Sequence, residues 1–145
     1  MNLADALVSP SEYDGTTLIL PWEAVIGNGY EVLHVSVFGN FFLVDPSGKI
    51  WLLDSWTGEL HGVSLSYAEY KNELNSNPDF FTSWFLLPLI AQMTSQGLVR
   101  RSGYVFAPFI SPGLGGSLSP KNFSLAPLAA YVALSAHEIR AIKGL

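Results

Sequence analysis

The sequence predicts an α+β fold, in which a small antiparallel meander near the N-terminus is covered on one face by helices from the C-terminal half. Two turn signals, Gly39 with Asn40 and the Pro-Ser-Gly at 46–48, separate three β-rich stretches within residues 30–54. Beyond residue 60 the period of the apolar residues changes from two to that of a helix. A chain of 145 residues has the length of a single domain and can bury a hydrophobic core.

The N-terminal part is expected to consist of a lead-in followed by three strands. Residues 1–26 form the lead-in, with a short strand or extended stretch over 16–21 and a helical turn that begins at Pro21. The alternation that follows predicts strands, and their expected ranges are 30–38, 41–45 and 49–54.

The C-terminal part is expected to be mainly helical. Tyr67, Tyr70 and Leu74 recur at helical spacing, which predicts a first helix. The apolar run at 80–97 predicts a buried helix that is kinked or interrupted near Pro88, since proline breaks the backbone ladder. An extended stretch, a loop and a last helix complete the chain, at 104–110, 111–120 and from about 126 onward.

The charge is divided unevenly along the chain. Residues 1–80 carry 11 acidic and two basic side chains, a net charge of −9, whereas residues 81–145 carry one acidic and five basic side chains, a net charge of +4. This division is typical of a solvated acidic face, and it can also give two surfaces of opposite potential. An acidic balance argues against direct nucleic-acid binding, which needs Lys and Arg, and suits a basic protein partner.

Several classes of protein are disfavoured by composition. The chain has no cysteine, which excludes a disulfide framework and a thiolate site. Residues 1–15 contain no Lys or Arg, unlike a secretory signal, and the apolar run at 80–93 is only 14 residues long, too short to cross a bilayer. We therefore expect a cytoplasmic protein without membrane association.

No arrangement typical of a metal or cofactor site occurs in the sequence. The three histidines, His34, His61 and His137, are far apart and show no ligand spacing, so neither a metal nor a cofactor is expected. The glycine-rich stretch at 113–117 lacks the lysine of a phosphate-binding loop. Its glycines are expected to serve positive φ angles or close packing.

Acidic and aromatic residues are concentrated around the third strand. Asp45 and Asp54 end neighbouring strands, so they could form a carboxylate pair of a hydrolase, although such residues more often form turns. Trp51 and Trp56 are each either a core residue or an interface anchor. Trp56 lies in a turn, where burial is harder, so it is the better interface candidate.

Three segments together resemble a known family. Residues 27–60, GNGYEVLHVSVFGNFFLVDPSGKIWLLDSWTGEL, contain a G-x-G-Y-E-V-L start, an F-G-N turn and a W-x-L-D strand. Two later segments, YVFAPFISPGLGG at 104–116 and NFSLAPLAAYVALSAHEIRAIKG at 122–144, contain a glycine-rich loop and a closing helix. Over 27–145 the chain is similar to the C-terminal domain of type VI secretion immunity proteins that neutralise DNase effectors. Relatives often carry an additional N-terminal domain, for which 26 residues are too few, so we expect a single domain over 1–145.

The resemblance implies a bacterial protein that is not an enzyme and that binds and neutralises a cognate toxin, a basic nuclease. With this role, Trp56 would anchor the toxin, Asp54 and Glu59 would supply charge beside it, and Asp45 would be a further contributor. Two alternatives stay open. One is a non-catalytic interaction module, homodimeric through the apolar segment at 80–90, and the other is a carboxylate-dependent hydrolase.

Overall fold

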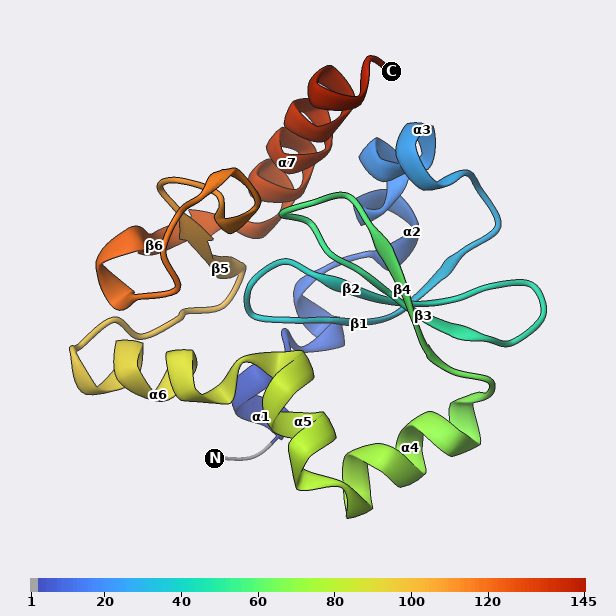
Figure 1. Cartoon of the computed structure of the whole chain (residues 1–145), viewed down its shortest axis with the longest axis horizontal. Helices are drawn as coiled ribbons and strands as arrows, with labels where there is room; N and C mark the ends of the chain where they lie inside the picture. Colours follow the sequence, from blue (N-terminus) through green and yellow to red (C-terminus); the bar gives the residue numbers. More distant parts are fainter. Residues whose placement is uncertain (1–2) are drawn as a thin grey trace.

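A four-stranded antiparallel meander lies at the centre of the structure, a computed structural model that describes residues 3–145 (Figure 1). Its strands, β1 (Glu31–Val35), β2 (Phe41–Val44), β3 (Ile50–Leu53) and β4 (Leu60–Ser64), follow one another in chain order. The predicted α+β class and the three predicted strands are confirmed. The fourth strand was not predicted, because its sequence LHGVS has a glycine at its centre and lacks β-rich alternation.

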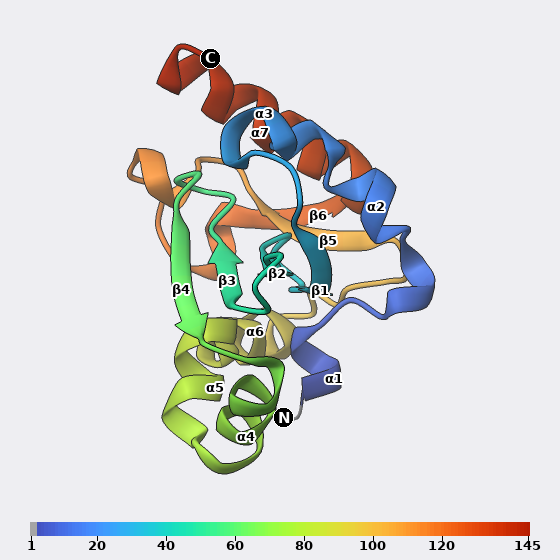
Figure 2. The same ribbon diagram turned by 90° about the vertical axis from the view of Figure 1, so that its right-hand side faces the viewer.

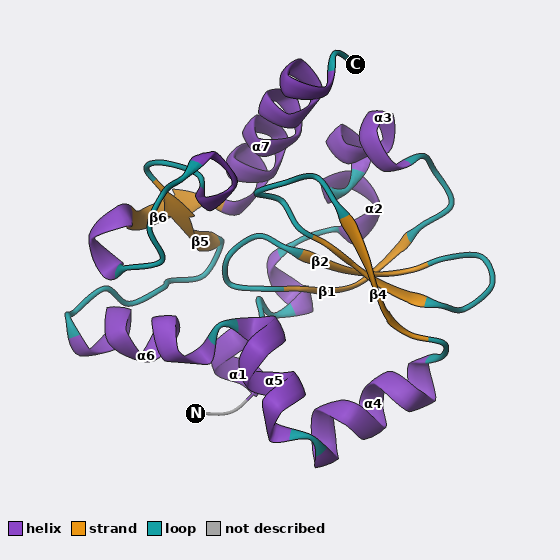
Figure 3. Ribbon diagram, viewed as in Figure 1, coloured by secondary structure: helices purple, strands orange, loops and turns teal. Residues whose placement is uncertain are grey.

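A second, two-stranded sheet pairs β5 (Tyr104–Pro108) with β6 (Phe123–Pro127) (Figure 3). The amide nitrogen of Phe106 donates to the carbonyl oxygen of Val37 at 2.8 Å, which joins this sheet to the turn after β1. The predicted extended stretch at 104–110 thus includes a true strand. Its partner β6 directly precedes the last helix.

The lead-in is helical rather than extended. It contains α1 (Leu3–Ala6), α2 (Gly15–Leu18) and α3 (Glu23–Ile26), with 3-10 turns between them. The strand or extended stretch expected over 16–21 is wrong, because the Asp14 carboxylate accepts hydrogen bonds from the Thr16 amide and the Thr17 hydroxyl and caps a helix there. The helical turn expected from Pro21 is confirmed.

Four longer helices follow the sheet: α4 (Tyr67–Ser76), α5 (Pro78–Phe85), α6 (Leu87–Ser95) and α7 (Leu128–Lys143). The interruption predicted near Pro88 lies at Leu86, whose φ of 54° places it in the left-handed region. Pro88 then sits in the first turn of α6, where its missing N–H costs nothing. No helix in the described part of the chain is long and apolar enough to cross a membrane.

The central sheet is buried on both faces, not on one as expected. Phe41 and Phe42 are neighbours in β2 and are both completely buried, in different hydrophobic clusters. Phe41 packs with the cluster that contains Trp22 of the lead-in and Val132 of α7. Phe42 belongs to the other cluster, with side chains of α4, α5 and α6. Figure 2 shows this layering, with α2, α3 and α7 on one side and α4, α5 and α6 on the other.

The apolar segment at 80–90 is part of the core. Phe85, Leu89 and Ile90 are buried in the second cluster, and Phe85 stacks on Phe42 with ring centroids 5.0 Å apart. The apolar character of this segment had suggested a homodimer, and its burial in the core now explains that character.

An internal ion pair fastens the lead-in to the rest of the fold. Glu12 Oε1 accepts hydrogen bonds from Arg100 Nη1 at 2.8 Å and from the Gly103 amide at 2.7 Å, and Glu12 Oε2 accepts one from the Ser9 amide. Only 8% of the Glu12 side chain is exposed. The Arg100 guanidinium, followed by these amides, lowers the Glu12 pKa from 4.5 to about 2.

We predict that Glu12→Gln lowers the free energy of unfolding by about 2 kcal/mol at neutral pH, because Arg100 is left without its anionic partner. The depressed pKa means that Glu12 stabilises the fold fully above pH 4.5 and loses this contribution as the pH falls toward 2. Urea unfolding as a function of pH measures both effects. Glu31→Gln, which changes an exposed carboxylate on the edge strand β1, is the matched control. Equal losses in the two variants would contradict the assignment.

Candidate functional site

The structure brings three of the four predicted binding residues together and places the fourth elsewhere. Trp56, Asp54 and Glu59 share the turn between β3 and β4, whereas Asp45 lies in the turn between β2 and β3. Because β3 runs antiparallel between these turns, they are at opposite ends of the sheet, roughly 17 Å apart at 3.4 Å per residue. The carboxylate pair of Asp45 and Asp54 that a hydrolase would need is therefore not formed.

Asp45 forms and stabilises its own turn. Its Oδ1 accepts hydrogen bonds from the hydroxyl and amide of Ser47 and from the amide of Lys49, and its Oδ2 accepts one from Trp51 Nε1 at 2.9 Å. The Ser47 hydroxyl, followed by the Trp51 indole, lowers the pKa of Asp45 from 3.8 to about 2. Trp51 is half-buried, and Lys49 Nζ lies 4.1 Å from the centroid of its ring.

Trp56 connects three parts of the fold. Its half-buried ring contacts Phe38 edge-on, at a centroid distance of 6.0 Å, and Phe123 of β6 at 6.2 Å. Its Nε1 donates to the hydroxyl of Tyr131 on α7 at 3.2 Å. Asp54 supports this position, since its Oδ1 accepts a hydrogen bond from the Trp56 amide at 2.8 Å. Trp56 is thus held in place, with one part of its ring left to line a surface.

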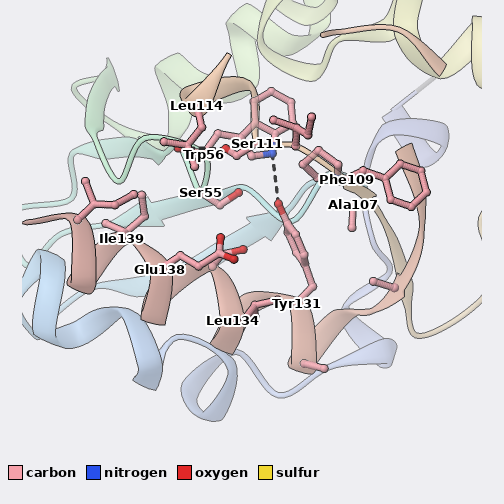
Figure 4. Close-up of a pocket in the computed structure, with 16 residues that line it drawn as sticks. Ser55, Trp56, Ala107, Phe109, Ser111, Leu114, Tyr131, Leu134, Glu138 and Ile139 are labelled. Carbon is pink, nitrogen blue, oxygen red and sulfur yellow. Dashed lines mark hydrogen bonds between the residues drawn. The ribbon is translucent and has the colours of Figure 1, made fainter. Parts of the chain in front are cut away.

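That surface is a groove of about 440 Å³ between α7, the end of β5 and the segment after it (Figure 4). Tyr131 and Trp56 contribute to its lining, and their hydrogen bond joins its two sides. Five large apolar side chains along it are more than half exposed: Phe109 (70%), Ile110 (58%), Leu114 (64%), Leu134 (55%) and Ile142 (60%). Apolar exposure gathered in this way is typical of a protein interaction surface.

The spacing of α7 explains one side of the groove. Leu134, Glu138 and Ile142 are four residues apart and therefore lie on one face of the helix. Val132, Ala136 and Ile139 on another face are buried and hold the helix against the sheet. The helix can therefore present an apolar stripe to the outside without loosening its contact with the core.

The glycine-rich loop explains the other side. A Cβ atom at Gly113 would collide with the carbonyl oxygen of Trp56, and one at Gly116 would collide with the carbonyl oxygen of Ile110. The Asn122 side chain fastens the same segment, accepting from the Ile110 amide at 3.0 Å and donating to the Ile110 carbonyl at 2.7 Å. The expectation that these glycines serve close packing is confirmed.

The groove carries one charge. Among the described residues that line it, Glu138 is the only charged one, and in Figure 4 both Glu138 and Tyr131 project from α7 toward Ser55 and Trp56. Burial raises the pKa of the Tyr131 hydroxyl, and the nearby charge of Glu138 acts in the same direction. Tyr131 therefore stays a neutral hydrogen-bonding group. Within residues 3–145, no group of three or more His, Asp or Glu side chains is arranged to hold a metal ion.

Sequence reasoning identified Trp56 but missed the rest of the groove. A signal was present, because the large apolar residues Phe109, Ile110 and Leu114 lie at the end of the predicted extended stretch and in the predicted loop. Apolar residues in an exposed loop are a typical mark of a binding surface.

Comparison with known proteins places this fold in a family. The family model described as "T6SS immunity protein Tdi1, C-terminal" matches residues 64–137, a little over half of the chain. The chain belongs to this Tdi1 C-terminal family. The match begins in β4 and ends in α7, so it contains eleven of the sixteen residues that line the groove. The segment at 27–60 that also suggested the resemblance lies outside it.

The crystal structure of Atu4351 from Agrobacterium tumefaciens is similar to this member of the Tdi1 family, with a TM-score of 0.54 and 13% sequence identity. The alignment covers 90% of this chain and 65% of that one, so the chain spans about two thirds of the length of Atu4351. This likeness supports the fold alone. No curated protein matches the sequence.

We predict that Tyr131→Phe lowers the free energy of unfolding by about 1 kcal/mol, because the half-buried Trp56 indole loses its acceptor. Denaturation in urea measures the change. Tyr67→Phe, which removes a hydroxyl from a side chain that is 48% exposed on α4, is the control and should change stability by less than about 0.5 kcal/mol. If the two variants have the same free energy of unfolding, the hydrogen bond between Trp56 and Tyr131 does not stabilise the groove.

Proposed function

We propose that this protein binds a toxic effector of a type VI secretion system and neutralises it, and that the effector is a basic nuclease. The observation that carries the proposal is membership of the Tdi1 C-terminal family, a family of immunity proteins. An immunity protein acts by binding, and the groove offers a suitable surface because five of its apolar side chains are more than half exposed.

The acidic N-terminal part supports the nuclease target. A nuclease holds DNA with Lys and Arg, and an acidic partner steers toward such a surface and pairs with it. Residues 1–80 carry the net charge of −9, and Asp54 and Glu59 share the β3–β4 turn with Trp56, which lines the groove. In this proposal these three residues border the binding face. Asp45 lies at the other end of the sheet, so the effector would contact it only through an interface that extends that far.

Location follows from the target. A nuclease toxin meets DNA in the cytoplasm, so the protein would act there, and it would bind the effector and not the nucleic acid itself.

The proposal predicts that an effector gene lies beside this one, and co-expression with that gene tests it. We expect cells that carry both genes to survive, cells that carry the effector alone to die, and the two proteins to co-purify as a complex. Death of both strains without a co-purifying complex would contradict the proposal.

We further predict that the variant Asp54→Asn/Glu59→Gln associates with the effector about three- to tenfold more slowly at low salt, because two charges that steer the encounter are removed. The asparagine side chain at position 54 still offers an oxygen that accepts from the Trp56 amide, so the turn is preserved. Stopped-flow association at low and high salt measures the effect, which should disappear at high salt. Glu69→Gln/Asp79→Asn makes the same change of charge on α4 and α5 and serves as control. A salt-independent effect would contradict steering.

A further inference from the structure

The groove between α7 and the segment 108–114 leaves five large apolar side chains exposed on its two sides. Leu134 and Ile142 project from α7, and Phe109, Ile110 and Leu114 project from the other side, all more than half exposed. The backbone beneath them is held by the Asn122 side chain and by the close approach of Gly113 to Trp56. A backbone held in this way loses little conformational entropy on binding, which favours a preformed docking site.

Glu138 adds a negative charge to this apolar surface. It is exposed, and no ion pair in the described part of the chain involves it. Lys143 lies further along the same helix, and its Nζ is 3.4 Å from the carbonyl oxygen of Gly58, away from the middle of the groove. A carboxylate without a cationic partner in the middle of an apolar stripe is complementary to one cation flanked by apolar groups.

We propose that the groove takes an apolar segment of the effector that carries a Lys or Arg side chain, with the cation paired to Glu138 and large apolar side chains lying along Leu134 and Ile142. This inference rests on the proposed function and specifies the chemistry of the partner. Binding would bury the exposed apolar groups around Trp56 and Tyr131, as in the centre of a typical protein interface.

Two other occupants fit less well. A small molecule would be enclosed by its site, whereas the apolar side chains here stand more than half exposed along the rim. A second copy of this chain packed symmetrically through the groove would bring two Glu138 carboxylates toward one another, and no other charged residue among those described in the lining compensates them. A basic segment of another protein avoids this repulsion.

The apolar part of the proposal is tested by Leu134→Gln/Ile142→Gln, with the dissociation constant for the purified effector measured by calorimetry. We expect binding to weaken by about 30-fold or more, as for the central residues of an interface. Leu65→Gln/Val99→Gln is the matched control, since both side chains are similarly exposed (74% and 63%) and lie outside the groove. It should stay within about threefold of the unmodified protein. Circular dichroism and thermal unfolding establish that all variants fold.

The charged part is tested at Glu138. Glu138→Gln should weaken binding about fivefold at low salt, and Glu138→Lys should weaken it about 30-fold or more, since it places two cations together. Glu69→Lys on α4 is the control for a change of net charge. An effector variant in which the paired Lys or Arg becomes Glu should recover binding to Glu138→Lys.

The outcomes separate the two proposals. If the unmodified protein does not bind the effector, both are overturned. If it binds and the groove variants bind equally well, the groove inference is overturned while the immunity function stands. If Leu134→Gln/Ile142→Gln converts a dimer to a monomer in sedimentation and leaves effector binding unchanged, the groove belongs to a second copy and the inference is likewise overturned.

Discussion

Phe41 and Phe42 set the main constraint on this fold, because adjacent residues of one strand point to opposite faces of the sheet and both are completely buried. Each face must therefore be covered. The lead-in and α7 cover one face, and α4, α5 and α6 cover the other. The position of α7 follows from this requirement, and so does the direction of its remaining outer face, which carries Leu134 and Ile142. The groove is in this sense a consequence of burying a sheet on both sides.

The groove is also where distant parts of the chain meet. The Trp56 indole from the β3–β4 turn donates to Tyr131 of α7, and Gly113 of the glycine-rich loop packs against the Trp56 backbone. Trp56 is thus packed against the core and also lines the groove, so its structural role does not exclude the proposed role as an interface anchor. The family match covers most of the lining but not Trp56 itself, which comes from the sheet.

Local sequence patterns predicted much of the fold. Alternation and turn residues located β1, β2 and β3, and helical spacing located α4 and α7, because in these segments propensity and packing agree. Prediction failed at β4 because a tertiary contact decides there: β3 offers this segment a partner strand. It also failed at residues 15–18, where the deciding contact is local, since Asp14 caps a helix. The apolar run FFLV of β2 is typical of a strand that is buried on both faces. This run therefore indicated that helices cover both faces of the sheet, although only one covered face was predicted. Of the residues predicted as a binding site, only Trp56 lines the groove. The approach of α7 to residues 109–114 is a long-range contact that no local pattern contains.

Hydrogen exchange of the protein alone and in complex with the effector would map the bound face without any substitution. If the effector occupies the groove, backbone amides in residues 109–116 and in the β3–β4 turn at 54–59 exchange more slowly on binding, with little change in α4 and α5. Slower exchange confined to α4 and α5, with residues 109–116 unchanged, would contradict binding in the groove.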